Sequence, residues 1–290
     1  MSEIAVPGIA RPASAPPSSA VALCAFELRI AARSGRLWLG VAAMGVVAAV
    51  VTALGLSAFR QLGVGATSPA AVALLDLMLI VPSALALVLG AIALQHDRES
   101  GFLDMLRCAG ATGTDVITAK LVATLFRGAV IVAGGFGAAA LVLAGSASAS
   151  DLVVFLVLML IALLTAAACA AIGVLVGACI RSRGGQAAMA GLAVWFTLAV
   201  GLDLALFAVA PIARVSAPVL FAILALDPIE AGRVLGLLAL GADSTVLGPL
   251  GTLLRDEIGT ARAAGLIVLI DGLWVGLATI AAGALAARRG

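Results

Sequence analysis

Residues 152–180 read LVVFLVLMLIALLTAAACAAIGVLVGACI, a run of 29 residues without a charged side chain. A helix of that length, at about 1.5 Å per residue, is longer than the roughly 30 Å hydrocarbon core of a bilayer. The run lacks the alternation of apolar and polar residues that marks a strand of a membrane β-barrel. The stretch therefore predicts a membrane-spanning helix and an all-α fold class.

Five other stretches meet the requirement of roughly 20 apolar residues. With the first, they give the predicted spans Leu37–Phe59, Leu77–Gln95, Leu121–Ser150, Leu152–Ile180, Gly184–Ala213 and Ala263–Ala287. Val215–Leu226 is too short to cross, and Val234–Leu254 is interrupted by glycine, proline and aspartate. We therefore expect a polytopic membrane domain over residues 37–287, with six transmembrane helices and a long loop over residues 212–262 on one side.

Composition excludes several classes of protein. The chain is 63% hydrophobic and 11% charged, against about 45–50% and 25% in soluble domains, and its net charge of +2 is too small to indicate a nucleic-acid partner. Four cysteines without CxxC spacing, one histidine and six scattered methionines indicate neither a metal site nor a cofactor in this chain. The spans also lack a ladder of these side chains for carrying a metal.

The arginines predict how the bundle is oriented. Eleven Lys and Arg residues belong to the termini and even-numbered loops, against five on the other face, four of them spread over the long loop. By the positive-inside rule both termini are cytoplasmic, and the chain lies in the cytoplasmic (inner) membrane. Residues 1–20, rich in Pro, Ala and Ser, are expected to form a disordered cytoplasmic tail.

Residues 21–36 have the pattern of an amphipathic helix at the membrane interface. Leu23, Phe26 and Ile30 recur at helical spacing beside a stripe of arginines at positions 29, 33 and 36. Such arginines reach toward lipid headgroups while the apolar side chains enter the membrane. The alternative is a simple extension of the first span.

The loop over residues 95–120 carries the most information about function. It begins QHDRESGFLDMLR, in which charged residues precede Phe102, Leu103, Met105 and Leu106 on a short segment with helical spacing. Exposed apolar side chains flanked by charges predict a segment that inserts into a groove on a soluble partner. The alternative is a connector that lies against the membrane.

Two polar features are expected on the opposite side. Asp227, Pro228 and Glu230 have the order of a helix start, and a helix of about a dozen residues should follow through Arg233. It would serve as a surface for an external partner or pack on the bundle. Asp203 and Asp271, at similar depth in the fifth and sixth spans, suggest a polar vestibule or, alternatively, separate hydrogen-bonded groups.

Within the third span, Arg127 is expected to reach the cytoplasmic surface with its long side chain. Two small-residue motifs, Gly173-xxx-Gly177 and Gly272-xxx-Gly276, allow helices to approach closely, and packing is their default meaning.

The chain lacks the sequence of a nucleotide-hydrolysing site. Its single lysine, Lys120, follows Ala119, so no GxxxxGK[ST] phosphate loop is present, and neither HExxH nor GxSxG occurs. The protein is expected not to be an enzyme. A transporter of this kind either uses an ion gradient or depends on a separate ATPase.

The loop sequence then supplies a resemblance. DRESGFLDML at residues 97–106, followed by DVITAKL at 115–121, resembles the acidic-Gly-Thr-Leu and Gly-Lys-Leu signature of ABC-2 type exporter permeases. The resemblance implies a homodimer in lipid, and a coupling helix that docks on an ATP-binding subunit holding Mg-ATP. The residues it assigns to ATPase coupling are Asp97, Glu99, Gly101, Phe102, Leu103, Leu106 and Lys120.

A narrower likeness is to the NosY type of permease, the membrane subunit of the ABC complex that helps supply copper to nitrous oxide reductase. It is carried by AGLAVWF at residues 190–196 with Asp203, and by LDPIEAGR at 226–233, where Asp227, Glu230 and Gly232 replace Asn, Asp and an aromatic residue. It implies a periplasmic accessory partner, with copper, a sulfur species or mechanical work as the output. The rival functions are an ion-coupled secondary carrier using Asp203 and Asp271, and a non-transporting membrane scaffold.

Overall fold

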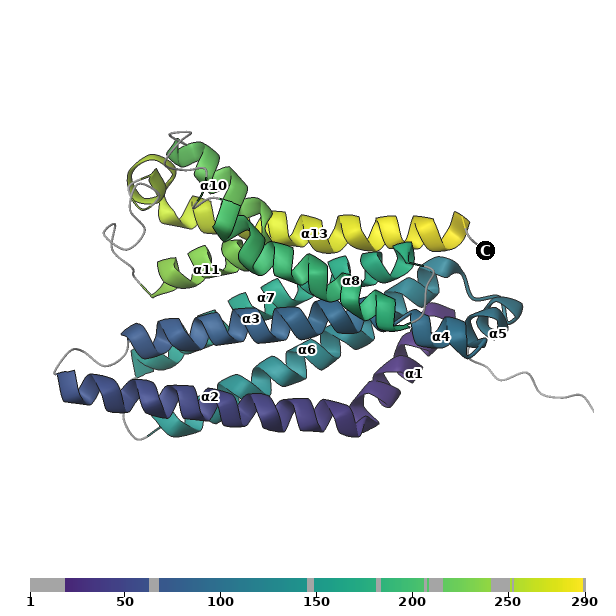
Figure 1. The fold of residues 1–290 in the computed structure, drawn as a ribbon, viewed down its shortest axis with the longest axis horizontal. Coiled ribbons are helices and arrows are strands. Elements are labelled where there is room, and N and C mark those ends of the chain that lie inside the picture. Colours follow the sequence, from purple (N-terminus) through teal and green to yellow (C-terminus); the bar gives the residue numbers. More distant parts are fainter. Residues whose placement is uncertain are drawn as a thin grey trace, which may run out of the picture.

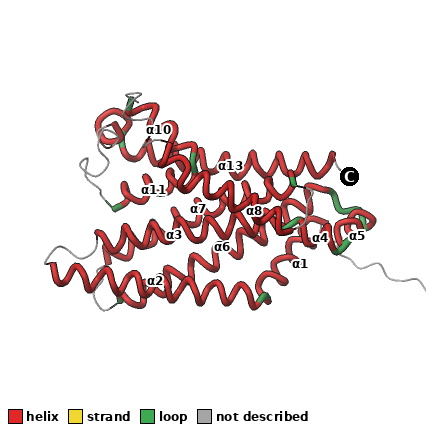
Figure 2. Tube along the Cα trace, in the orientation of Figure 1, coloured by secondary structure: helices red, strands yellow, loops and turns green. Residues whose placement is uncertain are grey.

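The computed structural model describes residues 19–62, 68–144, 149–180, 184–205, 208, 216–240, 251 and 253–288. Every regular element in this part of the chain is a helix (Figure 2). Six helices are long and apolar enough to cross a membrane. The all-α fold with six spans is therefore confirmed.

The spanning helices differ from the predicted ones mainly in their bounds. They are α2 (Gly35–Leu62), α3 (Ser68–Ile92), α6 (Gly113–Leu143), α7 (Ala149–Cys179), α8 (Gly184–Phe196) with the π-helical turn η1 (Thr197–Gly201), and α13 (Thr260–Arg288). The third span was predicted to begin at 121. It begins eight residues earlier because the Thr112 side chain accepts a hydrogen bond from the Asp115 amide, and Asp115 Oδ2 accepts one from the Thr112 amide.

A separate helix, α1 (Ser19–Arg33), precedes the first span. The predicted helix covers residues 21–36, so α1 begins two residues earlier and ends three residues earlier. It ends at Arg33 because Ser34 is not helical and Arg36 already belongs to α2. In Figure 1, α1 turns away from the axis of α2, and it packs on α6. It is thus not an uninterrupted extension of the first span. Its place at a membrane interface stays a prediction, and residues 1–18 of the predicted tail lie outside the described residues.

The centre of the bundle is the contact between α3 and α7, the most extensive in the molecule. Helix α2 packs on α6, and α8 packs on α3. A Cβ added at Gly173 or Gly177 would collide with the carbonyl oxygen of Leu87 or Ala91, and one at Gly90 would lie 2.7 Å from the Ala170 carbonyl oxygen. These glycines let the two backbones touch, as the first small-residue motif predicted.

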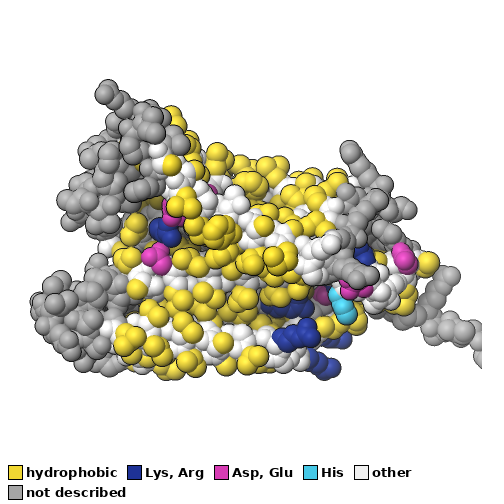
Figure 3. Space-filling model, in the orientation of Figure 1, with side chains coloured by type: hydrophobic (Ala, Val, Ile, Leu, Met, Phe, Trp, Pro, Cys, Tyr) yellow, Lys and Arg dark blue, Asp and Glu magenta, His cyan; other side chains and the backbone are white. Residues whose placement is uncertain are grey.

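The two ends of the bundle are built differently (Figure 1). One end carries α4 (Gln95–Glu99) and α5 (Phe102–Cys108), and the other carries α10 (Ala217–Leu226), α11 (Pro228–Ala239) and the π-helical turn η2 (Leu253–Ile258). The predicted loop over 212–262 is therefore largely helical where it is described, and positions 241–250 lie outside the described residues. Hydrophobic side chains cover the middle of the face in Figure 3, and charged ones gather toward the ends.

Both ends of the described chain lie at the α4–α5 end. Glu27 of α1 contacts Lys120 near the start of α6, and a Cβ at Gly113 would lie 3.0 Å from Ala286 near the end of α13. An even number of spans requires this arrangement.

Candidate functional site

The α4–α5 segment is bonded to the end of α7. Gln95 Nε2 donates hydrogen bonds to the carbonyl oxygens of Gly177 and Ile180, each at 3.0 Å. Arg98 Nη1 donates to the same two oxygens at 3.2 and 2.7 Å. The last carbonyls of a helix have no partner within it and carry its negative dipole end, so an amide and a guanidinium stabilise them. These four hydrogen bonds attach the α4–α5 segment to the end of α7.

A buried ion triad joins the same segment to α1 and α6. Lys120 Nζ donates a hydrogen bond to Glu27 Oε1 at 2.7 Å, and it lies 2.6 Å from Asp97 Oδ2 as a charge pair without hydrogen-bond geometry. All three side chains are at most 10% exposed. Asp97 and Lys120 were predicted to contact an ATPase. In the structure both side chains pair inside the protein, and their part in ATPase coupling stays a prediction.

The apolar residues of α5 also face the bundle more than the sequence suggested. The Phe102 ring stacks on Phe26 of α1 with centroids 6.1 Å apart, and Leu103 and Leu106 are half-buried against the core. In a helix, positions i, i+1 and i+4 share one side. Only Met105, with 59% of its surface exposed, projects outward. Among the described side chains of residues 95–108, those of His96, Glu99, Ser100, Asp104, Met105 and Cys108 are exposed.

Glycines close the turns on both sides of α5. Gly101 has φ +72° and Gly110 has φ +87°, in the left-handed region that side-chain-bearing residues rarely adopt. Gly101 was assigned to ATPase coupling, and the structure gives it a backbone role: it reverses the chain between α4 and α5.

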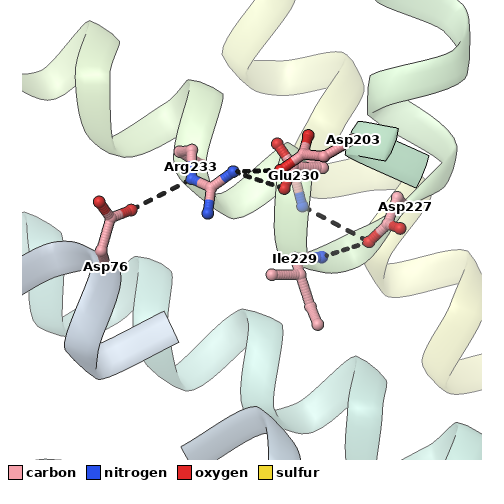
Figure 4. Close-up of polar contacts among 6 residues, drawn as sticks. All are labelled: Asp76, Asp203, Asp227, Ile229, Glu230 and Arg233. Atoms are coloured by element: carbon pink, nitrogen blue, oxygen red, sulfur yellow. Dashed lines mark hydrogen bonds and ion pairs between the residues drawn. The ribbon is translucent and has the colours of Figure 1, made fainter. Parts of the chain in front are cut away.

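At the opposite end, the helix predicted after Asp227 is present as α11. Asp227 Oδ1 accepts hydrogen bonds from the amides of Ile229 at 2.9 Å and Glu230 at 3.4 Å, with Pro228 at the first helical position (Figure 4). Glu230 does not complete a reciprocal cap, because its carboxylate turns to Arg233 at 2.7 Å.

Arg233 is the centre of a polar cluster that joins three helical segments. Its Nε donates to Asp76 Oδ1 of α3 at 3.1 Å, and its Nη1 donates to Asp203 Oδ2, after η1, at 3.4 Å (Figure 4). The side chains of Asp76 and Asp203 are 40% and 49% exposed, whereas that of Glu230 is 5% exposed. One guanidinium thus serves three carboxylates, and α11 is bonded to α3 and to the segment that follows η1.

The predicted vestibule of two aspartates is not formed by a described contact. Asp203 pairs with Arg233, while Asp271 of α13 is fully buried and neither of its carboxylate oxygens has a hydrogen-bond partner among the described residues. The Asp203 side chain is therefore about half exposed, whereas that of Asp271 is enclosed. The π-helical turn η1 ends two residues before Asp203, and such a turn rotates the residues that follow it around the helix.

Two partners were missed in the sequence. Asp76 was passed over because it directly precedes the predicted span starting at Leu77, and Glu27 because its helix was interpreted through its arginines. Each of the two carboxylates lies among apolar neighbours in the sequence, and this could have indicated that it has a charged partner. Arg127, by contrast, lies fourteen residues after the start of α6 and lines a cavity bounded by α1, α2 and α3.

Burial shifts the acid groups of α11 toward neutrality. It raises the pKa of Asp227 to about 6, against hydrogen bonds from the Ile229 and Glu230 amides, and that of Glu230 to about 7, against the charge of Arg233. A carboxyl whose pKa is raised on folding binds protons more tightly in the native state, so its stabilising contribution is complete below pH about 4 and is lost as pH rises through about 6–7.

We therefore expect the amides of α11 to exchange hydrogen faster, relative to intrinsic rates, at pH 8 than at pH 5. Hydrogen–deuterium exchange of the detergent-solubilised protein measures this. The double variant D227N/E230Q, in which asparagine retains the cap, should show equal protection at both pH values. Equal protection in the wild type would contradict the expectation.

Among the described residues, no group of three or more His, Cys, Asp and Glu side chains is arranged to hold a metal ion. The family model described as ABC-2 family transporter protein matches residues 21–247, from α1 to beyond α11. No match was found among curated proteins.

Proposed function

We propose, on the premise that this chain belongs to the ABC-2 transporter family, that it is the membrane permease subunit of an exporter whose ATP is hydrolysed on a separate subunit. The six membrane-spanning helices and the missing phosphate loop support this division of labour. Mg-ATP would be bound entirely by the partner. The distribution of arginines supports a cytoplasmic α4–α5 end, and thus cytoplasmic termini in the inner membrane.

The observation that carries the proposal is that α4 and α5 have one exposed face and one face bonded to the bundle. Their exposed face presents Glu99, Asp104 and Met105, while their inner face is bonded to α7 through Gln95 and Arg98 and to α1 and α6 through Lys120. A displacement imposed on the exposed face would therefore reach three helices directly. We propose that the ATPase docks there, with Met105 as its apolar anchor.

The motion would then be transmitted to the opposite end of the bundle, where α10 and α11 lie. Arg233 ties α11 to α3 and α8, so a tilt of either helix changes the position of α11. We propose that α10 and α11 face an extracytoplasmic partner and that the subunit works as a homodimer. The likeness to NosY-type permeases supports an accessory protein of copper-site maturation as that partner, with a copper or sulfur species as cargo or mechanical work as the output.

The test is made at Met105. We expect an ATP-binding subunit to co-purify with the full chain, and Met105→Asp to reduce the ATP turnover of the complex by about tenfold, the scale of one interface anchor. Met105→Leu, which keeps the apolar contact, should retain turnover. The mass of the complex should correspond to two permease chains. Absence of an ATPase, or equal turnover in both variants, would contradict the proposal.

A further inference from the structure

A cavity of about 720 Å³ lies at the α4–α5 end of the bundle. It is bounded by α1, by α2 and α3 along their halves near this end, by α6 and by the α4–α5 segment. Its apolar wall includes Leu37, Leu89 and Ile92, and its rim includes Phe26, Ile30 and Leu85, which are 38–47% exposed. With α1 at the predicted membrane interface, this apolar rim would face acyl chains.

The cavity also contains an arginine placed deep in the membrane. Arg127 is fourteen residues from the start of α6, about 21 Å along the helix axis, and α6 with its 31 residues is about 46 Å long. Helix α6 is about 16 Å longer than the roughly 30 Å hydrocarbon core. If all of this extra length projected from the core at the α4–α5 end, the Arg127 backbone would still lie about 5 Å inside the core. Ionisable groups at such depth are costly without a counter-charge or water.

The charges around the cavity leave one positive charge uncompensated. Lys120 is already held by Glu27 and Asp97, so that triad carries one net negative charge. Arg127 and Arg36 also line the cavity, and the described residues form no ion pair with either of them. With His96 neutral, the lining sums to one positive charge beside an apolar wall. Figure 3 shows Lys and Arg side chains gathered over this end of the molecule.

We propose that this cavity binds one anionic phospholipid from the surrounding leaflet, with its phosphate at Arg127 and Arg36 and its acyl chains along Leu85, Leu89 and Ile92. A guanidinium matches a phosphate with two parallel hydrogen bonds, which an ammonium cannot do, and two arginines supply the donors. A volume of this size suits the headgroup and upper chains, while the open rim lets the chains continue into the bilayer. The lipid would lie in the part of the cavity between α1 and α3.

The proposal is tested by native mass spectrometry of the full chain in mild detergent. The protein is titrated with dioleoylphosphatidylglycerol or dioleoylphosphatidylcholine, and the first bound lipid is quantified. We expect phosphatidylglycerol to bind at least tenfold more tightly. Arg127→Gln and Arg36→Gln should each weaken it about fivefold, the scale of one cation near a membrane charge. The matched variant Arg33→Gln, an exposed arginine outside the cavity, should bind like the wild type.

A second variant and a competition experiment complete the test. Arg36 is exposed, so Arg36→Gln reports on the site even if Arg127→Gln does not fold. Glycerol phosphate should not displace the lipid at millimolar concentration, and displacement would show a soluble phosphate site in its place. Equal binding of the two lipids, or equal weakening by Arg33→Gln and Arg36→Gln, would overturn the proposal and leave a hydrated cavity as the surroundings of Arg127.

Discussion

Replacement of Gly173 by alanine is expected to separate α3 from α7 and to destabilise the whole bundle. The added methyl group would collide with the backbone carbonyl of Leu87, which cannot move without moving α3 itself. Overpacking of a well-packed core costs typically 1–3 kcal/mol, and a clash with backbone belongs at the upper limit. We expect a loss of about 3 kcal/mol and a fall of several degrees in the thermal midpoint, measured by fluorescence-detected gel filtration of the solubilised protein.

The chain contains its own control for this experiment. Gly272 opens the second small-residue motif, yet a Cβ at this position meets no atom within 4 Å. Gly272→Ala introduces the same methyl group into a transmembrane helix and should leave the thermal midpoint unchanged within about 1 °C. If both variants melted together, intrinsic helix effects rather than the α3–α7 contact would explain the loss.

Replacement of Lys120 by methionine should have a comparable or larger effect. It leaves the carboxylates of Glu27 and Asp97 buried, side by side and without a cation, in a part of the bundle where neither is more than 8% exposed. Removing one partner from a buried ion pair costs about 3–5 kcal/mol. We expect poor yield and detachment of α1, detected as faster proteolysis in the α1–α2 connection around Ser34.

The loss of stability in Lys120→Met should come from the two carboxylates left without a cation rather than from the loss of the lysine itself. The triple variant K120M/E27Q/D97N removes all three charges and should recover most of the stability, because neutral groups of similar volume often replace a buried ion pair without loss. Arg29→Met, which removes an exposed cation on α1, should be neutral. A triple variant as unstable as K120M would contradict this explanation.

Much of the fold could be predicted because the bilayer imposes a simple rule. Each span is a long apolar run that the sequence displays directly, and the start of α11 is marked by Asp227, Pro228 and Glu230 within four residues. Local signals of this kind need no knowledge of the rest of the chain. The start of α6 was the exception, because its cap at Thr112 was overlooked beside the more visible charges of the loop.

The candidate sites were harder because their bonds connect distant residues. Lys120 and Glu27 are 93 positions apart, and Arg233 and Asp76 are 157 apart. Hydrophobic periodicity identifies the helix of each residue but not which charge will face which. The assignment of Asp97 and Lys120 to ATPase coupling stays a prediction for this reason: the loop signature identifies the segment, whereas the structure shows which of its residues are bonded internally.

The glycine contacts between α3 and α7 also determine which parts of the molecule can move. Two helices in backbone contact at Gly90, Gly173 and Gly177 cannot slide or rotate past each other without collision, so they behave as a single rigid body. Helix α8 also lies close to α3, because a Cβ at Gly191 would lie 3.3 Å from the Val88 Cα, whereas α1 packs on α6 and not on this pair. A cycle of conformations would therefore move α3 and α7 together as one unit, so that a displacement of α7 at the α4–α5 end would be carried by α3 to Asp76 and α11 at the other end.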